Sequence, residues 1–106
     1  PNYTFLNFAN NIGDTVKVGS YPKGISQYGA LDMSGNVSEW VADWYGPYRS
    51  DDQTNPVGPI NGNSRVIRGG AWNLDFPIYL SSYVRMSNSQ TKISTTIGFR
   101  CALSHP

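Results

Sequence analysis

Short stretches rich in β-branched and aromatic residues recur along the chain, and glycine or proline separates them. The 106 residues include 11 Gly and 7 Pro, and a proline disfavours helix in the residue before it. Long regular helices are therefore not expected, and short strands fit the pattern better. The predicted strands cover residues 16–21, 38–45, 65–68, 82–86 and 97–103.

The segment 38–45 shows the clearest two-residue alternation. In a strand, alternate side chains face opposite sides. One face would then carry Trp40, Ala42 and Trp44, and the other Glu39, Val41 and Asp43. A helix over residues 37–44 stays open at this point, because no residue there breaks one.

Composition limits the possible partners. Charged residues are only 14% of the chain and the net charge is +1, with the Lys and Arg residues scattered, so nucleic acid is not an expected partner. No apolar run is long enough for a membrane span, and no signal peptide is visible, which leaves the localisation unknown. Five of the seven acids lie between Asp32 and Asp52, and this local acidity would suit a cation.

Three ordered motifs carry the strongest signal. They are DMSGNVSEW at 32–40, RGGAW at 68–72 and IGFRCA at 97–102. Together they resemble the C-terminal portion of the formylglycine-generating enzyme family, also called sulfatase-modifying factors. The resemblance implies that residues 1–106 are the C-terminal portion of one such domain, with a separate N-terminal half as a possible partner.

The implied fold is α+β and C-type-lectin-like, in which a small twisted antiparallel sheet supports long ordered loops with little regular secondary structure. The resemblance also favours a strand over a helix for residues 38–45. Most of the α part would belong to the N-terminal half.

The catalytic chemistry of the family is not expected here. In formylglycine-generating enzymes, two cysteines after the second motif hold copper, and the corresponding positions fall near Leu74 and Tyr79. The chain has a single cysteine, Cys101, so no thiolate pair can select Cu(I). We expect a module without formylglycine-generating activity and without copper. Cys101 lies in an apolar strand pattern, which predicts a buried, inert thiol.

The first motif is a candidate calcium site. Calcium prefers six to eight oxygen ligands of mixed kind, and a tight turn with positive φ at Gly35 and Asn36 would fold Asp32 back toward Glu39. The resemblance implies a structural Ca²⁺ held by the Asp32 and Glu39 carboxylates and the Gly35 and Val37 carbonyls. The alternative is that Asp32 caps a turn and Glu39 is only solvated.

A second family site is implied at Asn7 and Phe8. Its ligands would be the Asn7 side chain and the Phe8 carbonyl, with further oxygen donors from nearby residues. Ser38 stands where the family usually has Trp, which removes an aromatic contact but no ligand.

The segment 72–88 combines aromatic rings with small hydrogen-bonding groups, a composition typical of adaptable contact surfaces. We predict that it binds a peptide, glycan or protein ligand. The predicted contact residues are Trp72, Asn73, Asp75, Tyr79, Tyr83, Arg85 and Asn88.

Two alternatives stay open for the function. Lectin-fold proteins diversified by retroelements vary this same segment and bind targets with it. The chain could also be part of an enzyme, of the oxidase or the iron-dependent sulfoxide synthase type, whose catalytic groups lie in an N-terminal half.

Overall fold

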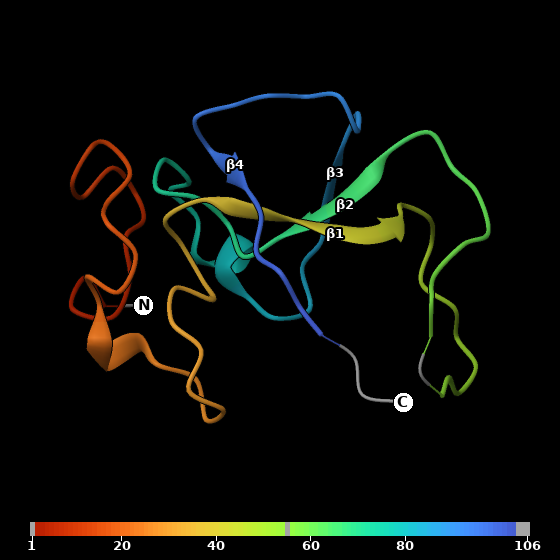
Figure 1. The fold of residues 1–106 in the computed structure, drawn as a ribbon, viewed down its shortest axis with the longest axis horizontal. Helices are drawn as coiled ribbons and strands as arrows, with labels where there is room; N and C mark the ends of the chain where they lie inside the picture. Colours follow the sequence, from red (N-terminus) through yellow and green to blue (C-terminus); the bar gives the residue numbers. More distant parts are fainter. Residues whose placement is uncertain (1, 55, 104–106) are drawn as a thin grey trace.

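A four-stranded sheet lies at the centre of the molecule, and long loops surround it (Figure 1). The computed structural model describes residues 2–54 and 56–103. The strands are β1 (Ser38–Trp44), β2 (Arg65–Arg68), β3 (Met86–Asn88) and β4 (Ile97–Gly98). Two short 3-10 helices complete the described chain, η1 (Pro22–Gly24) and η2 (Pro77–Leu80). Within the described residues, neither helix has the length or the apolar character needed to cross a bilayer.

The strand order in the sheet is β3-β2-β1-β4. β1 pairs with β2, and β2 with β3, in antiparallel fashion, whereas β1 and β4 are parallel. The predicted fold class is thus confirmed, but the predicted antiparallel sheet is wrong for β4. After β3 the chain crosses above the sheet and enters beside β1 in the same direction as β1 (Figure 1), so the pairing of β4 has to be parallel.

Two of the predicted strands are close to the observed ones. Residues 65–68 form β2 as expected, and β1 ends one residue before the predicted end of its segment, which excludes the helix at 37–44. The strand predicted at 82–86 is wrong in position, because a turn in which Val84 N donates to Ser81 O at 3.2 Å delays the ladder until Met86. β4 keeps only the first two residues of the segment 97–103.

The strand predicted at 16–21 does not form. Ser20 N donates to Lys17 O at 3.2 Å, which closes a turn, and Gly19 has a φ of 79°. The backbone of Val16 is instead paired with a side chain, since Val16 N donates to Asn36 Oδ1 at 3.0 Å and Asn36 Nδ2 donates to Val16 O at 3.2 Å. The side-chain amide of Asn36 therefore pairs with the backbone of Val16 as a neighbouring strand would.

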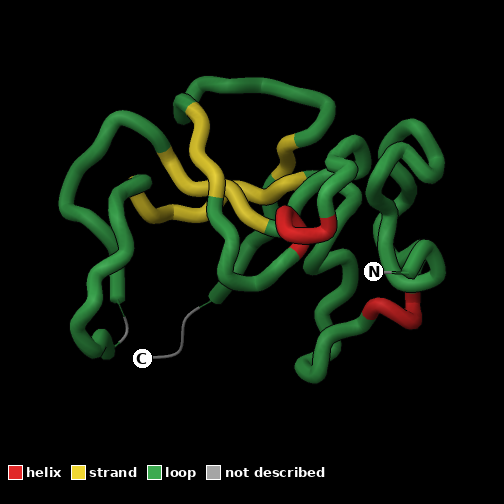
Figure 2. The backbone as a smooth tube through the Cα atoms, turned by 180° about the vertical axis from the view of Figure 1, so that it is seen from behind, coloured by secondary structure: helices red, strands yellow, loops and turns green. Residues whose placement is uncertain are grey.

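The hydrophobic core is small, and buried amides extend it. Its buried apolar side chains are Phe8, Val66, Ile67, Ala71 and Leu80, and its buried polar ones are Asn7, Asn36 and Ser38. Loops make up most of the fold (Figure 2).

Backbone hydrogen bonds join three of these loops. Asn36 N donates to Asn7 O, and Trp72 N donates to Asn36 O, both at 2.8 Å. The N-terminal loop, the turn before β1 and the loop after β2 are thereby held together beside the sheet. Because such bonds need no repeating apolar pattern, the loops can be ordered without regular secondary structure.

Candidate functional site

The turn from Asp32 to β1 has the geometry that the sequence predicted. Asp32, Gly35 and Asn36 have φ values of 54°, 77° and 62°. A Cβ on Gly35 would lie 2.5 Å from Asn7 O, so only glycine fits this position. The close approach of the two backbones is what brings Asn7 and Asn36 together in the core.

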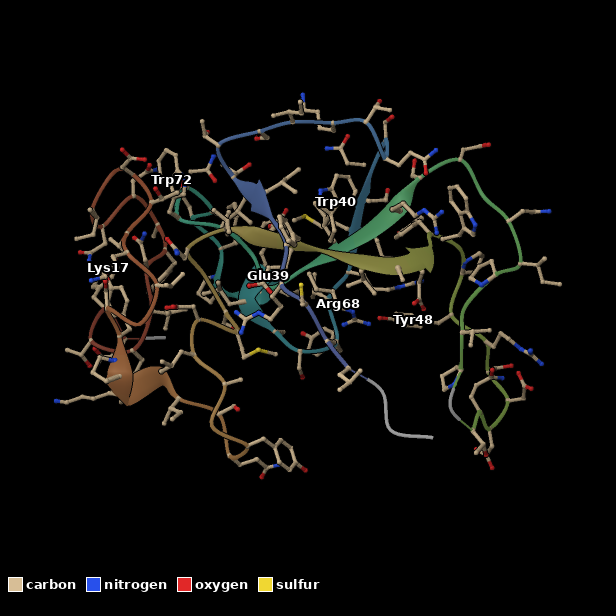
Figure 3. The ribbon with its side chains drawn as sticks, viewed as in Figure 1. Lys17, Glu39, Trp40, Tyr48, Arg68 and Trp72 are labelled. Atoms are coloured by element: carbon tan, nitrogen blue, oxygen red, sulfur yellow. The ribbon has the colours of Figure 1, made fainter. Side chains whose placement is uncertain are left out.

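Three of the four residues predicted to bind calcium surround one cavity. Asp32, Val37 and Glu39 line it, and its volume is about 390 Å³; Gly35 lies in the same turn but does not line it. Asp32 Oδ2 accepts from Gly19 N at 2.8 Å, so this carboxylate bridges two loops and does not cap its own turn. Glu39 projects from β1 near the centre of the molecule (Figure 3).

Arg100 closes this cavity from the C-terminal side. Its Nε and Nη2 donate to the two carboxylate oxygens of Glu39, each at 2.7 Å, and Nη2 also donates to Asp32 O at 2.9 Å. The hydrogen bond that Arg100 donates to Glu39 raises the pKa of Arg100, so the guanidinium stays charged. Glu39 is therefore paired and not merely solvated, with 21% of its side chain exposed.

The oxygen donors in this turn fit a hard cation, on one condition. Two carboxylates and the nearby carbonyls are the ligand types that calcium prefers. Both Glu39 oxygens are already held by Arg100, so a calcium ion would have to displace the guanidinium. Arg100 was not predicted as a site residue, and its only signal in the sequence was its place in the third motif.

The second predicted calcium site contains an unpaired buried oxygen. Asn7 is 1% exposed, and its Nδ2 donates to Asp14 O at 2.9 Å and to Asn36 Oδ1 at 3.4 Å. Its Oδ1 has no hydrogen-bond partner among the described residues, and such a buried acceptor costs about 1–3 kcal/mol when it stays unpaired. An amide oxygen in this state fits the role of a cation ligand.

Phe8 is the other residue predicted for that site. Its side chain is buried and stacks on Tyr3, with ring centroids 4.8 Å apart. Its carbonyl accepts from Asn11 N at 3.0 Å, so one lone pair of this oxygen is already used. The second lone pair of a carbonyl can still serve a cation.

The structure divides the residues predicted for ligand contact into separate groups. Trp72 Nε1 donates to Thr95 O at 3.2 Å, and Figure 3 shows Trp72 to the left of the sheet and Tyr48 to the right of its centre. The Arg85 guanidinium lies 3.7 Å above the Tyr48 ring, next to the backbone of Tyr83, whose carbonyl accepts from Tyr48 Oη at 2.8 Å.

The remaining predicted contact residues differ in exposure and in position. Asn73 and Asp75 are exposed. Tyr79 is half-buried, with its ring edge to face against Phe76 at 6.4 Å. Asn88 stands opposite Arg65 in the β2–β3 ladder. These residues therefore form a surface that extends across the molecule, and they do not converge on one point.

Cys101 corrects one prediction from the sequence. Its thiol is exposed and free, whereas an apolar strand pattern had predicted burial. The reason is that β4 ends at Gly98, so Phe99 and Cys101, which would share one face of a longer strand, lie beyond the sheet that would have covered them. Leu74 and Tyr79, near the positions of the copper-binding cysteines in the family, lie on the loop after β2 and in η2.

The sheet, its long ordered loops and the Asp32–Glu39 turn define a C-type-lectin-like domain of the formylglycine-generating enzyme type. A family model described as the sulfatase-modifying factor enzyme 1-like domain matches residues 2–105. The chain belongs to this family, and it corresponds to a C-terminal region of it.

Known proteins agree with this assignment. The chain is 41% identical over 93 residues to the serine/threonine-protein kinase pkn1 of Chlamydia pneumoniae, covering 84% of this chain and 14% of the kinase. It is 39% identical over 94 residues to the formylglycine-generating enzyme of Streptomyces coelicolor, covering 83% of this chain and 29% of the enzyme.

A solved structure, Treponema denticola variable protein 1, superimposes with a TM-score of 0.80 at 29% identity, over 91% of this chain and 34% of that protein. The chain spans less than a third of the length of the Chlamydia kinase and of the Streptomyces enzyme.

Proposed function

We propose that this chain is part of a non-catalytic, calcium-stabilised lectin-like module that binds a peptide, glycan or protein through the surface of residues 72–88. One observation carries the calcium half of the proposal. The turn before β1 brings Asp32 and the β1 residue Glu39 to the lining of one cavity, in a family domain with a very small apolar core.

A cation would act here as a clamp between loops. Asp32 belongs to the turn before β1, Glu39 to β1, and Asn7 with its unpaired Oδ1 to the N-terminal loop. Ions bound at these oxygens would hold the segments together where few apolar contacts do. The stabilisation is RT ln(1 + [Ca]/Kd), or about 2.7 kcal/mol at a hundredfold excess over Kd.

Thermal unfolding in calcium and in chelator tests this clamp. For a domain of this size, the expected difference in Tm is on the order of 10 °C. Glu39→Gln and Asp32→Ala should each remove most of that difference, because each removes a charge from the coordination shell. Asp52→Asn, an exposed acid outside the cavity, is the matched control and should keep it. A wild-type transition that chelator leaves unmoved, with no metal in elemental analysis, would refute the calcium proposal.

The absence of a cysteine pair supports the non-catalytic part of the proposal. Cys101 is the only cysteine, and neither Leu74 nor Tyr79 can provide a thiolate for Cu(I). Incubation with copper and a peptide containing Cys-x-Pro-x-Arg should leave the mass of the peptide unchanged. A loss of mass at the peptide cysteine would overturn this part.

A second candidate is a retroelement-diversified variable protein that binds ligands with the same segment. The similarity to a protein named variable protein 1, with a TM-score of 0.80, favours it. Sibling copies of the coding region that differ only within residues 73–88 would support this candidate. Copies that differ evenly along the chain would argue against it.

A third candidate is an enzyme whose catalytic groups lie in an N-terminal half. It is motivated by the short span of this chain relative to its enzyme relatives, since it covers 29% of the Streptomyces enzyme. The upstream coding sequence is the decisive observation, because histidines at metal-binding spacing there would support an enzyme of the iron-dependent type, and their absence would argue against it.

A further inference from the structure

A second cavity lies apart from the turn between Asp32 and β1. Its volume is about 720 Å³, and the β1–β2 side of the sheet and parts of the loop between β1 and β2 enclose it. Val41 and Asp43 face it from β1, where the strand alternation had placed both on the same face as Glu39. Apart from Arg85, no residue predicted to bind a ligand or a metal lines this cavity.

Two arginines, Arg68 and Arg85, line this cavity, and Tyr48 joins them. The Arg85 guanidinium lies 3.7 Å from the centre of the Tyr48 ring, and Arg68 Nη2 donates to Tyr48 Oη at 3.3 Å. Figure 3 shows Arg68 and Tyr48 close to each other. The ring holds both cations in place, because a planar guanidinium stacks on an aromatic face and also donates in its own plane.

Neither guanidinium is neutralised within the described part of the chain. The ion pairs found there join Arg49 to Asp51 and Arg100 to Glu39, and they leave Arg68 and Arg85 without a carboxylate within 4.0 Å. Arg68 donates to Ser82 O at 2.6 Å and Arg85 to Gly46 O. Since a guanidinium has five N–H donors, most of the donors remain for a ligand.

The cavity lining also includes aliphatic residues. Val57 and Ile60 are among them, and Pro56 and Pro59 are their neighbours in the chain. The exposed fraction is 83% for Val57 and 97% for Ile60. Such aliphatic surface gains free energy when an apolar group covers it. A lining that combines arginines with aliphatic side chains is expected for a ligand with an acidic group and an apolar body.

Asp43 limits how much negative charge the cavity accepts. It lines the same cavity, and its Oδ2 is 2.8 Å from the place that a Cβ on Gly58 would occupy, so the loop passes directly over it. Its charge offsets one of the two free guanidiniums. A monoanion is then favoured over a doubly charged phosphate, and a carboxylate matches the two-point geometry of arginine.

We propose that this cavity binds a small aliphatic carboxylate, with the acid on Arg68 and Arg85 and the hydrocarbon against Val57 and Ile60. This site is separate from the turn proposed to bind calcium, and it shares only Arg85 with the surface of residues 72–88. Its ligand is a small molecule or the carboxylate end of a chain, and both share the same chemistry.

Titration of the full chain with 4-methylpentanoate, followed by NMR or calorimetry, tests the site. Saturable binding is expected, with a Kd on the order of 1 mM for a ligand of this size. The neutral analogue 4-methylpentan-1-ol should bind at least about tenfold more weakly. The same is expected of 3-methylbutyl phosphate, a phosphate ester that carries close to two negative charges above its second pKa of about 6. These comparisons use the unaltered protein, so no folding defect can explain them.

Arg85→Gln and Arg68→Gln should each weaken 4-methylpentanoate by about tenfold. Lys17→Gln removes the same charge far from the cavity and should leave the Kd within about twofold, because long-range attraction is screened by salt. Absence of saturable binding would overturn the proposal, and so would equal affinity for the alcohol or an equal loss in Lys17→Gln. A peptide ending in leucine distinguishes the two sources of the carboxylate. If it binds with a similar Kd, the cavity admits the end of a chain, and if only 4-methylpentanoate binds, the ligand is a small molecule.

Discussion

Arg100 and Glu39 form a two-point ion pair across 61 residues of sequence, with both nitrogen–oxygen distances at 2.7 Å. Glu39 lies on the central strand β1, opposite Arg68 on one side and Gly98 on the other. The pair therefore fastens the chain after β4 to the middle of the sheet, at the same carboxylate that the family resemblance assigns to calcium.

Competition between Arg100 and calcium is the first prediction. Arg100→Gln frees both Glu39 oxygens, so calcium should bind about fivefold more tightly, as measured by calorimetry. In chelator the same variant should lose less than about 1 kcal/mol of unfolding free energy, because the Arg100 side chain is 37% exposed and solvent screens the pair. Weaker calcium binding in this variant would mean that Arg100 supports the site and does not compete for it.

Gly35 is the second prediction. Gly35→Ala combines positive φ with a Cβ 2.5 Å from Asn7 O, so we expect a loss of roughly 3 kcal/mol or more in unfolding free energy. Gly13→Ala is the matched control, because Gly13 has a φ of 84° but no neighbour within 4 Å. It should lose only about 1–2 kcal/mol. Equal losses in urea unfolding would show that the close backbone approach has no cost.

Asn36→Ala is the third prediction. It removes two hydrogen bonds to Val16 and leaves the Val16 backbone without a partner, so unfolding should become about 2–3 kcal/mol easier. Hydrogen exchange at Val16 N should accelerate before global unfolding, since this amide is held by a side chain alone. Asn73→Ala, at an exposed position, is the control and should change little. Unchanged protection at Val16 would contradict the structural role of the amide.

Tyr83 offers the fourth prediction, on the proposed ligand surface. It is 66% exposed, so Tyr83→Ala should leave the Tm nearly unchanged while weakening a ligand from a glycan array or a peptide library by about 1–3 kcal/mol. The half-buried Tyr79 packs on Phe76, so Tyr79→Ala should also lower stability. A large loss of stability in Tyr83→Ala would remove this ring from the contact surface.

Cys101 gives the fifth prediction. Because its thiol is exposed, a disulfide reagent should modify one thiol per chain in the native state. The rate should be close to that of the same protein in denaturant. Reaction only after unfolding would restore the buried thiol that the sequence pattern had suggested.

Several features could be predicted from particular residues. The three ordered motifs indicated the family, and the alternation from Glu39 to Trp44 indicated β1. The Gly35-Asn36 pair predicted a turn with positive φ, because these residue types tolerate that conformation. These features depend on local sequence, where propensity and periodicity are informative.

Other features depend on contacts between distant segments. The chain at 16–21 is rich in strand-forming residues, yet the backbone N–H and C=O of Val16 are hydrogen-bonded to the Asn36 side chain and not to a neighbouring strand. The Arg100 ion pair with Glu39, and the approach of Arg68 and Arg85 to Tyr48, join residues that no spacing rule connects. Local pattern could not reveal them, because each depends on how loops without regular structure fold over the sheet.

The sequence by itself determined the family, the fold class, the central strand with Glu39 and the turn before it with Asp32, since each rests on short-range pattern or on a motif. Only the tertiary structure decided the parallel pairing of β4, the exposure of Cys101, the unpaired oxygen of Asn7 and the arginine-lined cavity. The physical reason is that a small apolar core leaves the loops to be placed by hydrogen bonds and ion pairs between distant residues, and such partners are chosen in space and not along the chain.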